Sequence, residues 1–132
     1  MRNIPEEFHD LFEDETKAFA FLATTMTDGS PQVTPVWFTT DGDHILINSA
    51  KGRTKDRNMR TRQQVAIAIM DPNKPYRYIQ IRGKVVETTE EGARNLINAL
   101  SKKYTGNEVF PGPEDEIRVT YKIKVKFTNS KE

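Results

Sequence analysis

The stretch VAIAIMDPNKPYRYIQIRGKVVE, residues 65–87, decides the fold. Its first part, VAIAIMD, is an almost continuous apolar run, which is typical of a strand buried on both faces of a sheet. The residues PNKP that follow predict a turn, because proline and asparagine favour turn conformations. The chain continues as YRYIQIRGKVVE, a long strand in which Gly83 is a candidate β-bulge. The stretch therefore predicts an antiparallel pair of strands.

Other segments extend this pair into a sheet. Residues 17–25 form a second apolar run that predicts a strand buried on both faces. Residues 32–40 and 44–50 flank the turn DGD and predict a hairpin. Pro35 within the first of these strands indicates an edge, a bulge or a ligand-facing position, because proline has no N–H to donate to a neighbouring strand.

The C-terminal segment alternates between apolar and polar residues, which predicts a strand with one face toward the core. The residues expected on the core face are Val119, Tyr121, Ile123, Val125 and Phe127. The residues expected on the solvent face are Arg118, Thr120, Lys122, Lys124 and Lys126.

Six strands and two or three helices are expected in all. The helices are predicted over residues 3–13, over residues 55–62 with Thr54 as the cap, and from a capping box at residues 88–91 to Gly106. Six strands around one core favour a small barrel, because closure removes exposed sheet edges. The predicted fold is mostly β: a six-stranded, mainly antiparallel β-barrel with flanking helices.

Length and composition limit the function of this barrel. The chain, 1–132, is expected to be a single domain. It has no apolar run of about 18 residues and no signal peptide, so we expect a cytoplasmic protein without a membrane partner. With no cysteine and only two histidines, a metal site, a Cys nucleophile and a Ser–His hydrolase are not expected. Any enzymatic chemistry is therefore expected to belong to a cofactor.

A basic segment, NSAKGRTKDRNMRTR at residues 48–62, suggests an anionic ligand. Six basic residues and one acid between positions 51 and 62 give a local charge of +5, in a chain whose net charge is +1. With Thr54 as cap, Lys51, Arg53 and Lys55 would surround a helix start whose free N–H groups favour an anion. A solvated helix without ligand and a nucleic-acid site are the alternatives. The near-neutral charge of the whole chain argues against nucleic acid.

Two aromatic features allow either packing or ligand binding. Trp37, the only tryptophan, lies beside Pro35 on a strand next to the basic segment, and it is either a core residue or a ligand platform. Tyr76 and Arg77 can stack on and pair with an anionic ligand, or they can form ordinary cross-strand pairs. The residues alone leave both questions open.

Four stretches together resemble one family. They are GSPQVTPVWF (29–38), INSAKGRTKDRN (47–58), VAIAIMDPNKPYRYIQIRGKV (65–85) and KKYTGNEVFPGP (102–113). In this order they are similar to the flavin- and deazaflavin-binding split barrels related to pyridoxamine 5′-phosphate oxidase. The likeness extends to the branch of small reductases that use coenzyme F420, a 5-deazaflavin. It implies a split barrel of the FMN-binding type, as a homodimer with the cofactor at the subunit interface.

The resemblance also implies a set of cofactor-binding residues. Those expected along the flavin ring are Thr34, Pro35, Val36 and Trp37. Those expected at the ring edge are Asn48, Ser49 and Ala50. Those expected at the phosphate are Arg53, Lys55 and Asn58, with Lys51, Arg57 and Arg60 available to a longer anionic tail. Tyr76 and Arg77 are expected to shape the cleft.

The implied activity is hydride transfer from coenzyme F420 to a small conjugated or heteroaromatic substrate. Such chemistry needs positioning of the ring more than acid–base catalysis, which suits a chain for which no catalytic residue is assigned. The C-terminal KVKFTNSKE has no Arg–aromatic motif matching that of pyridoxamine phosphate oxidases proper, so that oxidation is not expected. The alternatives are an FMN-dependent oxidoreductase of the same fold, a non-catalytic flavin or deazaflavin carrier, and a basic nucleic-acid-binding module.

Overall fold

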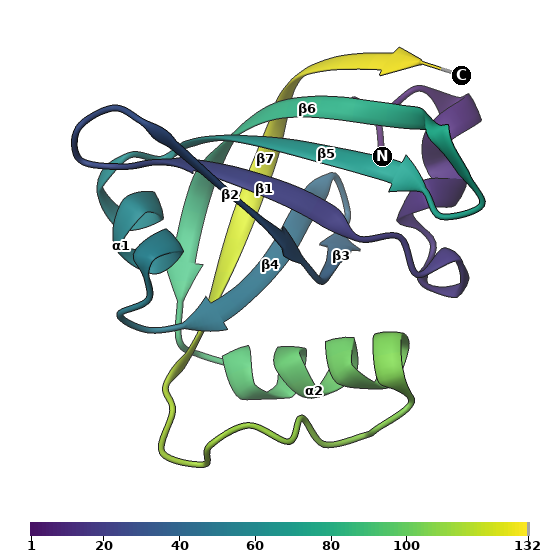
Figure 1. Cartoon of the computed structure of the whole chain (residues 1–132). Helices are drawn as coiled ribbons and strands as arrows, with labels where there is room; N and C mark the ends of the chain where they lie inside the picture. The colour runs from purple at the N-terminus through teal and green to yellow at the C-terminus, as the bar shows by residue number, and fades with distance from the viewer. Residues whose placement is uncertain (132) are drawn as a thin grey trace.

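The computed structural model describes residues 1–131, which form seven strands and four helical segments (Figure 1). The strands are β1 Ala20–Thr25, β2 Pro31–Val36, β3 Phe38–Asp41, β4 His44–Ala50, β5 Gln64–Asp71, β6 Lys74–Thr89 and β7 Arg118–Lys131. They pair antiparallel in the order β2-β1-β5-β6-β7-β4-β3. The sheet curls into a half-barrel (Figure 1), which confirms the predicted mostly-β class.

The prediction of six strands is wrong, because residues 32–40 do not form a single strand. β2 pairs with β1 at one edge of the sheet, whereas β3 pairs with β4 at the other edge. One extended strand cannot lie along both edges, so the chain divides at Trp37, the residue between β2 and β3. The predicted edge position of Pro35 is confirmed.

The hairpin predicted over residues 65–87 is confirmed as β5 and β6. The register between β6 and β7 shifts at Gly83, as expected of a bulge. A Cβ atom on residue 83 would lie 2.7 Å from the main-chain oxygen of Lys124 and 2.9 Å from Cγ2 of Ile123, so a larger residue does not fit. The bulge lies where the two longest strands pair, within the curl of the sheet.

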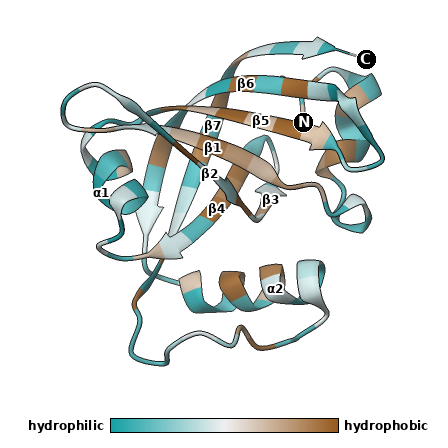
Figure 2. Ribbon diagram, in the orientation of Figure 1, coloured by the Kyte–Doolittle hydropathy of each residue, from teal (hydrophilic) through white to brown (hydrophobic). Residues whose placement is uncertain are grey.

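Burial alternates along the strands that were predicted to be buried on both faces. In β5, Ile67 and Ile69 are buried, but Ala66 and Met70 are exposed, and β1 alternates in the same way. The prediction is wrong because the curled sheet encloses only its inner face. Figure 2 shows the resulting pattern, in which hydrophobic residues recur along the strands between more polar ones.

The C-terminal strand follows the predicted alternation only in part. Four of the predicted core residues are buried: Val119, Tyr121, Ile123 and Val125. Phe127 is 61% exposed, because the bulge opposite Gly83 inserts one residue into β7 and reverses the alternation. Arg118 and Thr120, predicted to face solvent, are buried, because the helix that follows β6 packs against this end of β7.

The helical segments are η1 Glu6–Phe12, η2 Asp14–Thr16, α1 Thr54–Thr61 and α2 Ala93–Thr105. The first is a 3₁₀-helix and lies within the helix predicted over residues 3–13. With three residues per turn, it directs Phe8 and Leu11 to the same side, and both are buried in the core. No helix within residues 1–131 is long and apolar enough to cross a membrane.

The predicted helix ends are confirmed only in part. Thr54 is the first residue of α1 rather than its cap, and the Asp56 carboxylate instead accepts a hydrogen bond from the Gly52 N–H at 2.9 Å. No side-chain cap forms at the box predicted at residues 88–91, since α2 begins after it. Gly106 ends α2 with a φ of 85°, as predicted.

Candidate functional site

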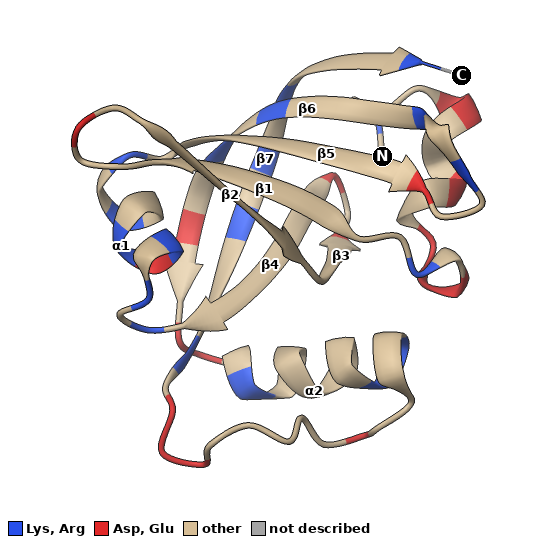
Figure 3. Ribbon diagram, viewed as in Figure 1, with Lys and Arg blue, Asp and Glu red and all other residues tan. Residues whose placement is uncertain are grey.

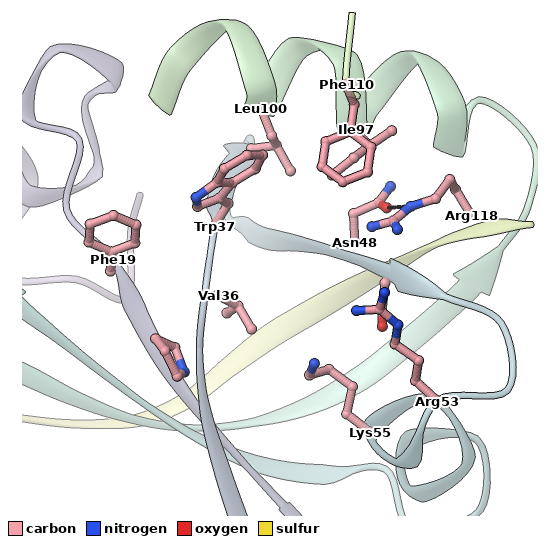
Figure 4. A pocket seen from close by; sticks show the side chains of 12 residues that line it. Phe19, Val36, Trp37, Asn48, Arg53, Lys55, Ile97, Leu100, Phe110 and Arg118 are labelled. Carbon is pink, nitrogen blue, oxygen red and sulfur yellow. Dashed lines mark hydrogen bonds between the residues drawn. The ribbon is translucent and has the colours of Figure 1, made fainter. Parts of the chain in front are cut away.

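A cavity of about 390 Å³ opens between β2, β4 and the start of α1 on one side and α2 on the other. Figure 4 shows the side chains that line it. The apolar lining consists of Phe19, Pro35, Val36, Trp37, Ile97, Leu100 and Phe110. The polar lining consists of Asn48, Ser49, Arg53, Lys55 and Arg118. A concave, mainly apolar cavity with a few converging polar groups is typical of a small-molecule site.

Stacked aromatic rings form the apolar wall. Tyr104 on α2 stacks with Phe19 and Trp37, at centroid distances of 5.2 Å and 5.3 Å, and its ring is within 8° of parallel to Trp37. The Tyr104 hydroxyl donates to the Ala18 main-chain oxygen at 2.6 Å, and burial raises its pKa to about 12. Phe110 meets Trp37 edge-on at 6.1 Å. This anchored stack holds Trp37 as a flat apolar surface.

A buried carboxylate holds the turn before α1. Asp56 accepts hydrogen bonds from the Gly52 N–H at 2.9 Å, from Arg60 Nε at 2.9 Å and from the Tyr121 hydroxyl. Burial alone would raise the pKa of Asp56, but these donors keep it below its ordinary value. Gly52 has a φ of 93°, a conformation that favours glycine. Asp56 therefore fixes the turn that carries Arg53 to the cavity.

Two cations beside this turn keep positive charge available to a ligand. Lys55 is half-buried, points into the cavity (Figure 4) and forms no ion pair within the described part of the chain. Burial, and then the neighbouring Arg53 and Arg118, lowers the pKa of Lys55. The Arg53 side chain is 58% exposed and lies 3.7 Å from the Glu116 carboxylate. An anion bound between Arg53 and Lys55 would stabilise both charges.

A second hollow, of about 380 Å³, continues from the polar end of the cavity along the start of α1. Its lining is Gln32, Gly52, Arg53, Thr54, Lys55 and Arg57. Figure 3 shows the basic residues gathered on α1 and the turn before it. Lys51 and Arg60 are already paired with carboxylates, at 2.8 Å and 2.9 Å. Arg57 has no carboxylate partner among residues 1–131, so it adds to the charge that a ligand can reach.

Two buried hydroxyl oxygens, Ser49 Oγ and Thr34 Oγ1, have no hydrogen-bond partner among residues 1–131. Ser49 is 2% exposed and lines the cavity together with Arg53 and Lys55. Leaving such a buried group unpaired costs about 1–3 kcal/mol, which a ligand atom at this position would recover. The site therefore fits a ligand that combines a flat apolar ring, hydrogen-bonding groups and an anion.

Residues 4–129 match the family described as pyridoxamine 5′-phosphate oxidase. The chain belongs to this family. Among solved structures, an F420 reductase is 29% identical and superposes with a TM-score of 0.84, over 96% of this chain and 98% of that one. A conserved hypothetical protein from Mycobacterium tuberculosis is 21% identical, with a TM-score of 0.74 over 96% of this chain and 84% of that one, and shows the fold alone. No curated protein sequence matches the chain.

Most residues predicted from the likeness to the pyridoxamine 5′-phosphate oxidase family lie at one site. Those that line the cavity are Pro35, Val36, Trp37, Asn48, Ser49, Arg53 and Lys55. Thr34 precedes this lining on β2, and Ala50 and Lys51 line an adjoining hollow. Asn58 is buried and donates to Thr24 Oγ1 at 3.0 Å, so within the chain it fastens α1 to β1.

Tyr76 and Arg77 are not brought to the cavity. They lie near the turn between β5 and β6, where Tyr76 is 84% exposed. Arg77 forms ion pairs with Asp10 at 2.7 Å and Asp71 at 3.0 Å, and its guanidinium lies over the Phe8 ring. Within a single chain, neither residue therefore lines the cavity that the two were predicted to shape.

Sequence reasoning missed five of the lining residues: Phe19, Ile97, Leu100, Phe110 and Arg118. Arg118 donates from Nε to Asn48 Oδ1 at 2.9 Å and lies 5.1 Å from the centre of the Phe110 ring. The alternation along its strand predicted that Arg118 faces solvent. It is buried because α2 packs against this end of β7, which the strand's own sequence does not show. Ile97 and Leu100 lie within the predicted third helix, but the sequence did not predict the cavity that they line.

Proposed function

We propose that the protein is an oxidoreductase that binds coenzyme F420 and transfers a hydride to a small conjugated or heteroaromatic substrate. One observation carries the proposal: a single cavity joins a flat aromatic wall to Arg53 and Lys55, next to the unpaired hydroxyl of Ser49. Membership of the pyridoxamine 5′-phosphate oxidase family and the likeness to an F420 reductase support a flavin- or deazaflavin-related oxidoreductase.

The cavity residues suit the parts of such a coenzyme. Arg53 and Lys55 would bind its phosphate, and the Ser49 hydroxyl would hydrogen-bond to the ring edge. Pro35 and Trp37 would lie along the ring and exclude water from its face. The bound coenzyme would supply the redox chemistry, while the chain contributes position and a dry environment.

The cations favour coenzyme F420 over FMN. Arg53 and Lys55 would serve the phosphate of either coenzyme. Coenzyme F420 also carries an oligoglutamate tail, and Arg57 extends the positive charge along α1 without a carboxylate partner among residues 1–131. Lys51 and Arg60, also considered for the tail, are held in ion pairs. Arg57 is therefore the tail contact that we propose.

We also propose a homodimer with the cofactor at the subunit interface. The strand registers place Val33, Ala23, Ala66, Arg82 and Phe127 in one row across the outer face of the sheet. Val33 is 64% exposed and Phe127 61%, and an exposed, mainly apolar row with one arginine suits protein–protein contact. Light scattering at micromolar concentration is expected to give twice the 15.2 kDa mass of the chain. A mass of one chain would contradict the dimer.

Titration with coenzyme F420 is expected to quench the fluorescence of Trp37 strongly and saturably. Trp37 is the only tryptophan, so the signal reports a ring placed against the aromatic wall. Binding in the micromolar range at physiological salt is expected, with FMN, FAD and a short DNA duplex titrated in parallel. Unchanged emission, with binding established by calorimetry, would contradict the place of Trp37 along the ring.

These titrations, the colour of the purified protein and a turnover assay together separate the alternative functions. Tight duplex binding without a response to any flavin would contradict the proposal and favour a nucleic-acid-binding module. A protein that purifies yellow and releases FMN on heating would favour an FMN-dependent enzyme. Binding of reduced coenzyme F420, without turnover of any conjugated substrate, would favour a carrier.

A further inference from the structure

The segment between α2 and β7, residues 106–117, runs beside α2 toward the polar end of the cavity (Figure 1), and we call it the strap. It is tied down at two points. The Phe110 N–H donates to Asn98 Oδ1 at 2.8 Å, and Arg94 Nη2 donates to the main-chain oxygen of Glu116 at 2.5 Å. The strap therefore holds the Glu116 side chain in a defined place beside the site.

Glu116 contacts two cavity arginines in different ways. Its carboxylate accepts a hydrogen bond from Arg118 Nη1, and it lies 3.7 Å from Arg53 Nη2. The Arg118 side chain is 5% exposed, whereas that of Arg53 is 58% exposed. Because 3.7 Å is longer than a hydrogen bond, Glu116 holds Arg118 tightly and Arg53 loosely.

This difference bears on any anion that enters the cavity. Arg118 is committed to the protein, since it also donates to Asn48 Oδ1. Arg53 is free to turn toward a ligand held by Lys55. The Glu116 carboxylate, paired with Arg118, would remain close to that ligand. It would repel the group held by Arg53 and Lys55 in proportion to the negative charge on that group alone.

We propose that Glu116 is a specificity-determining residue that limits the negative charge accepted at the phosphate position. The site then favours a phosphodiester, with one negative charge, over a phosphomonoester, whose charge approaches two near neutral pH. Coenzyme F420 carries a phosphodiester and FMN a phosphomonoester. The inference deepens the proposed function and rests on it for the identity of the coenzyme.

The test compares the wild type with Glu116→Gln, which removes the charge but keeps an acceptor for Arg118. Repulsion of about threefold in affinity for each ligand charge is of the size expected for a partly screened pair. Glu116→Gln should therefore raise the affinity for coenzyme F420 about threefold and for FMN about tenfold, and leave riboflavin unchanged. Calorimetry measures all three. Asp115→Asn, on the same strap but exposed and without an ion pair in residues 1–131, is the matched control.

Inorganic phosphate at pH 8 separates this inference from the proposed function. A gain of about tenfold in phosphate affinity in Glu116→Gln, at a site whose phosphate affinity Arg53→Ala lowers, would support the inference even if no flavin bound. Two results would overturn the inference and make Glu116 a positioning residue for Arg53. One is that Glu116→Gln binds both coenzymes more weakly than the wild type does. The other is that its affinities for FMN and coenzyme F420 change by the same factor. If Glu116→Gln does not fold, Glu116→Asp keeps a charge for Arg118 at greater distance from Arg53. In Glu116→Asp, the ratio of the affinity for FMN to the affinity for coenzyme F420 should then rise. An unchanged ratio would overturn the inference.

Discussion

Replacing Arg53 and Lys55 together by alanine is expected to weaken the binding of coenzyme F420 by a factor of roughly 10² to 10⁴. Each cation would make a charge-assisted hydrogen bond to the phosphate, worth about 1.5–3 kcal/mol, and tenfold in affinity corresponds to about 1.4 kcal/mol. Lys55 should contribute most, because it is half-buried, lies beside two arginines and has no carboxylate partner in the described part of the chain. Titration by Trp37 fluorescence measures the loss.

Lys17, before β1, and Lys74, at the start of β6, provide the control for this variant. Both are exposed and lie outside the cavity, and replacing both by alanine removes the same two charges. Screening at physiological salt should keep their effect within about threefold. Equal losses in the two double variants would show that binding follows the overall charge of the protein rather than the phosphate site.

Asp56→Ala is expected to lower the free energy of unfolding by about 3 kcal/mol, as for other buried charged groups whose partners lose their acceptor. The change would leave the buried Tyr121 hydroxyl and the Gly52 N–H without their shared acceptor. The turn that carries Arg53 would be released, so coenzyme affinity should fall as well. Urea denaturation, with and without coenzyme, measures both effects. Arg60→Ala, which removes only the part-exposed partner, should cost less than about 1 kcal/mol.

The contribution of Asp56 is also expected to depend on pH. Because the folded-state pKa of Asp56 is lowered, its stabilisation is complete above the unfolded pKa of about 4 and disappears as the pH falls through the folded value. The difference in unfolding free energy between the wild type and Asp56→Asn should therefore be constant near neutral pH and shrink below about pH 4. A difference that grew in acid would contradict this role.

Local residue preferences predicted individual strands better than the way they are joined. The hairpin over residues 65–87, the bulge at Gly83 and the helix end at Gly106 depend on neighbouring residues, and the structure confirms all three. The division of residues 32–40 at Trp37 depends instead on pairing with β1 and β4, which are distant partners. No local pattern marks that position, because the residues on both sides favour a strand.

The two ends of the cavity also differ in how far the sequence predicted them. Its polar end was predictable because Ser49, Arg53 and Lys55 lie within one short segment of the sequence. Its apolar end was predictable only in part: Pro35, Val36 and Trp37 lie on one strand segment, but the residues from α2 and the strap lie more than 40 positions beyond Lys55. Arg118 was placed in solvent for the same reason, since the helix that buries it belongs to another segment.

Trp37 is the single residue that joins the two edges of the sheet, and it also lines the cavity. One residue can connect β2 at one edge to β3 at the other only because the sheet is curled. The same curl therefore places Trp37 where it lines the cavity. A substitution in the lining can alter what the cavity accepts, but abolishing the cavity would mean flattening the sheet.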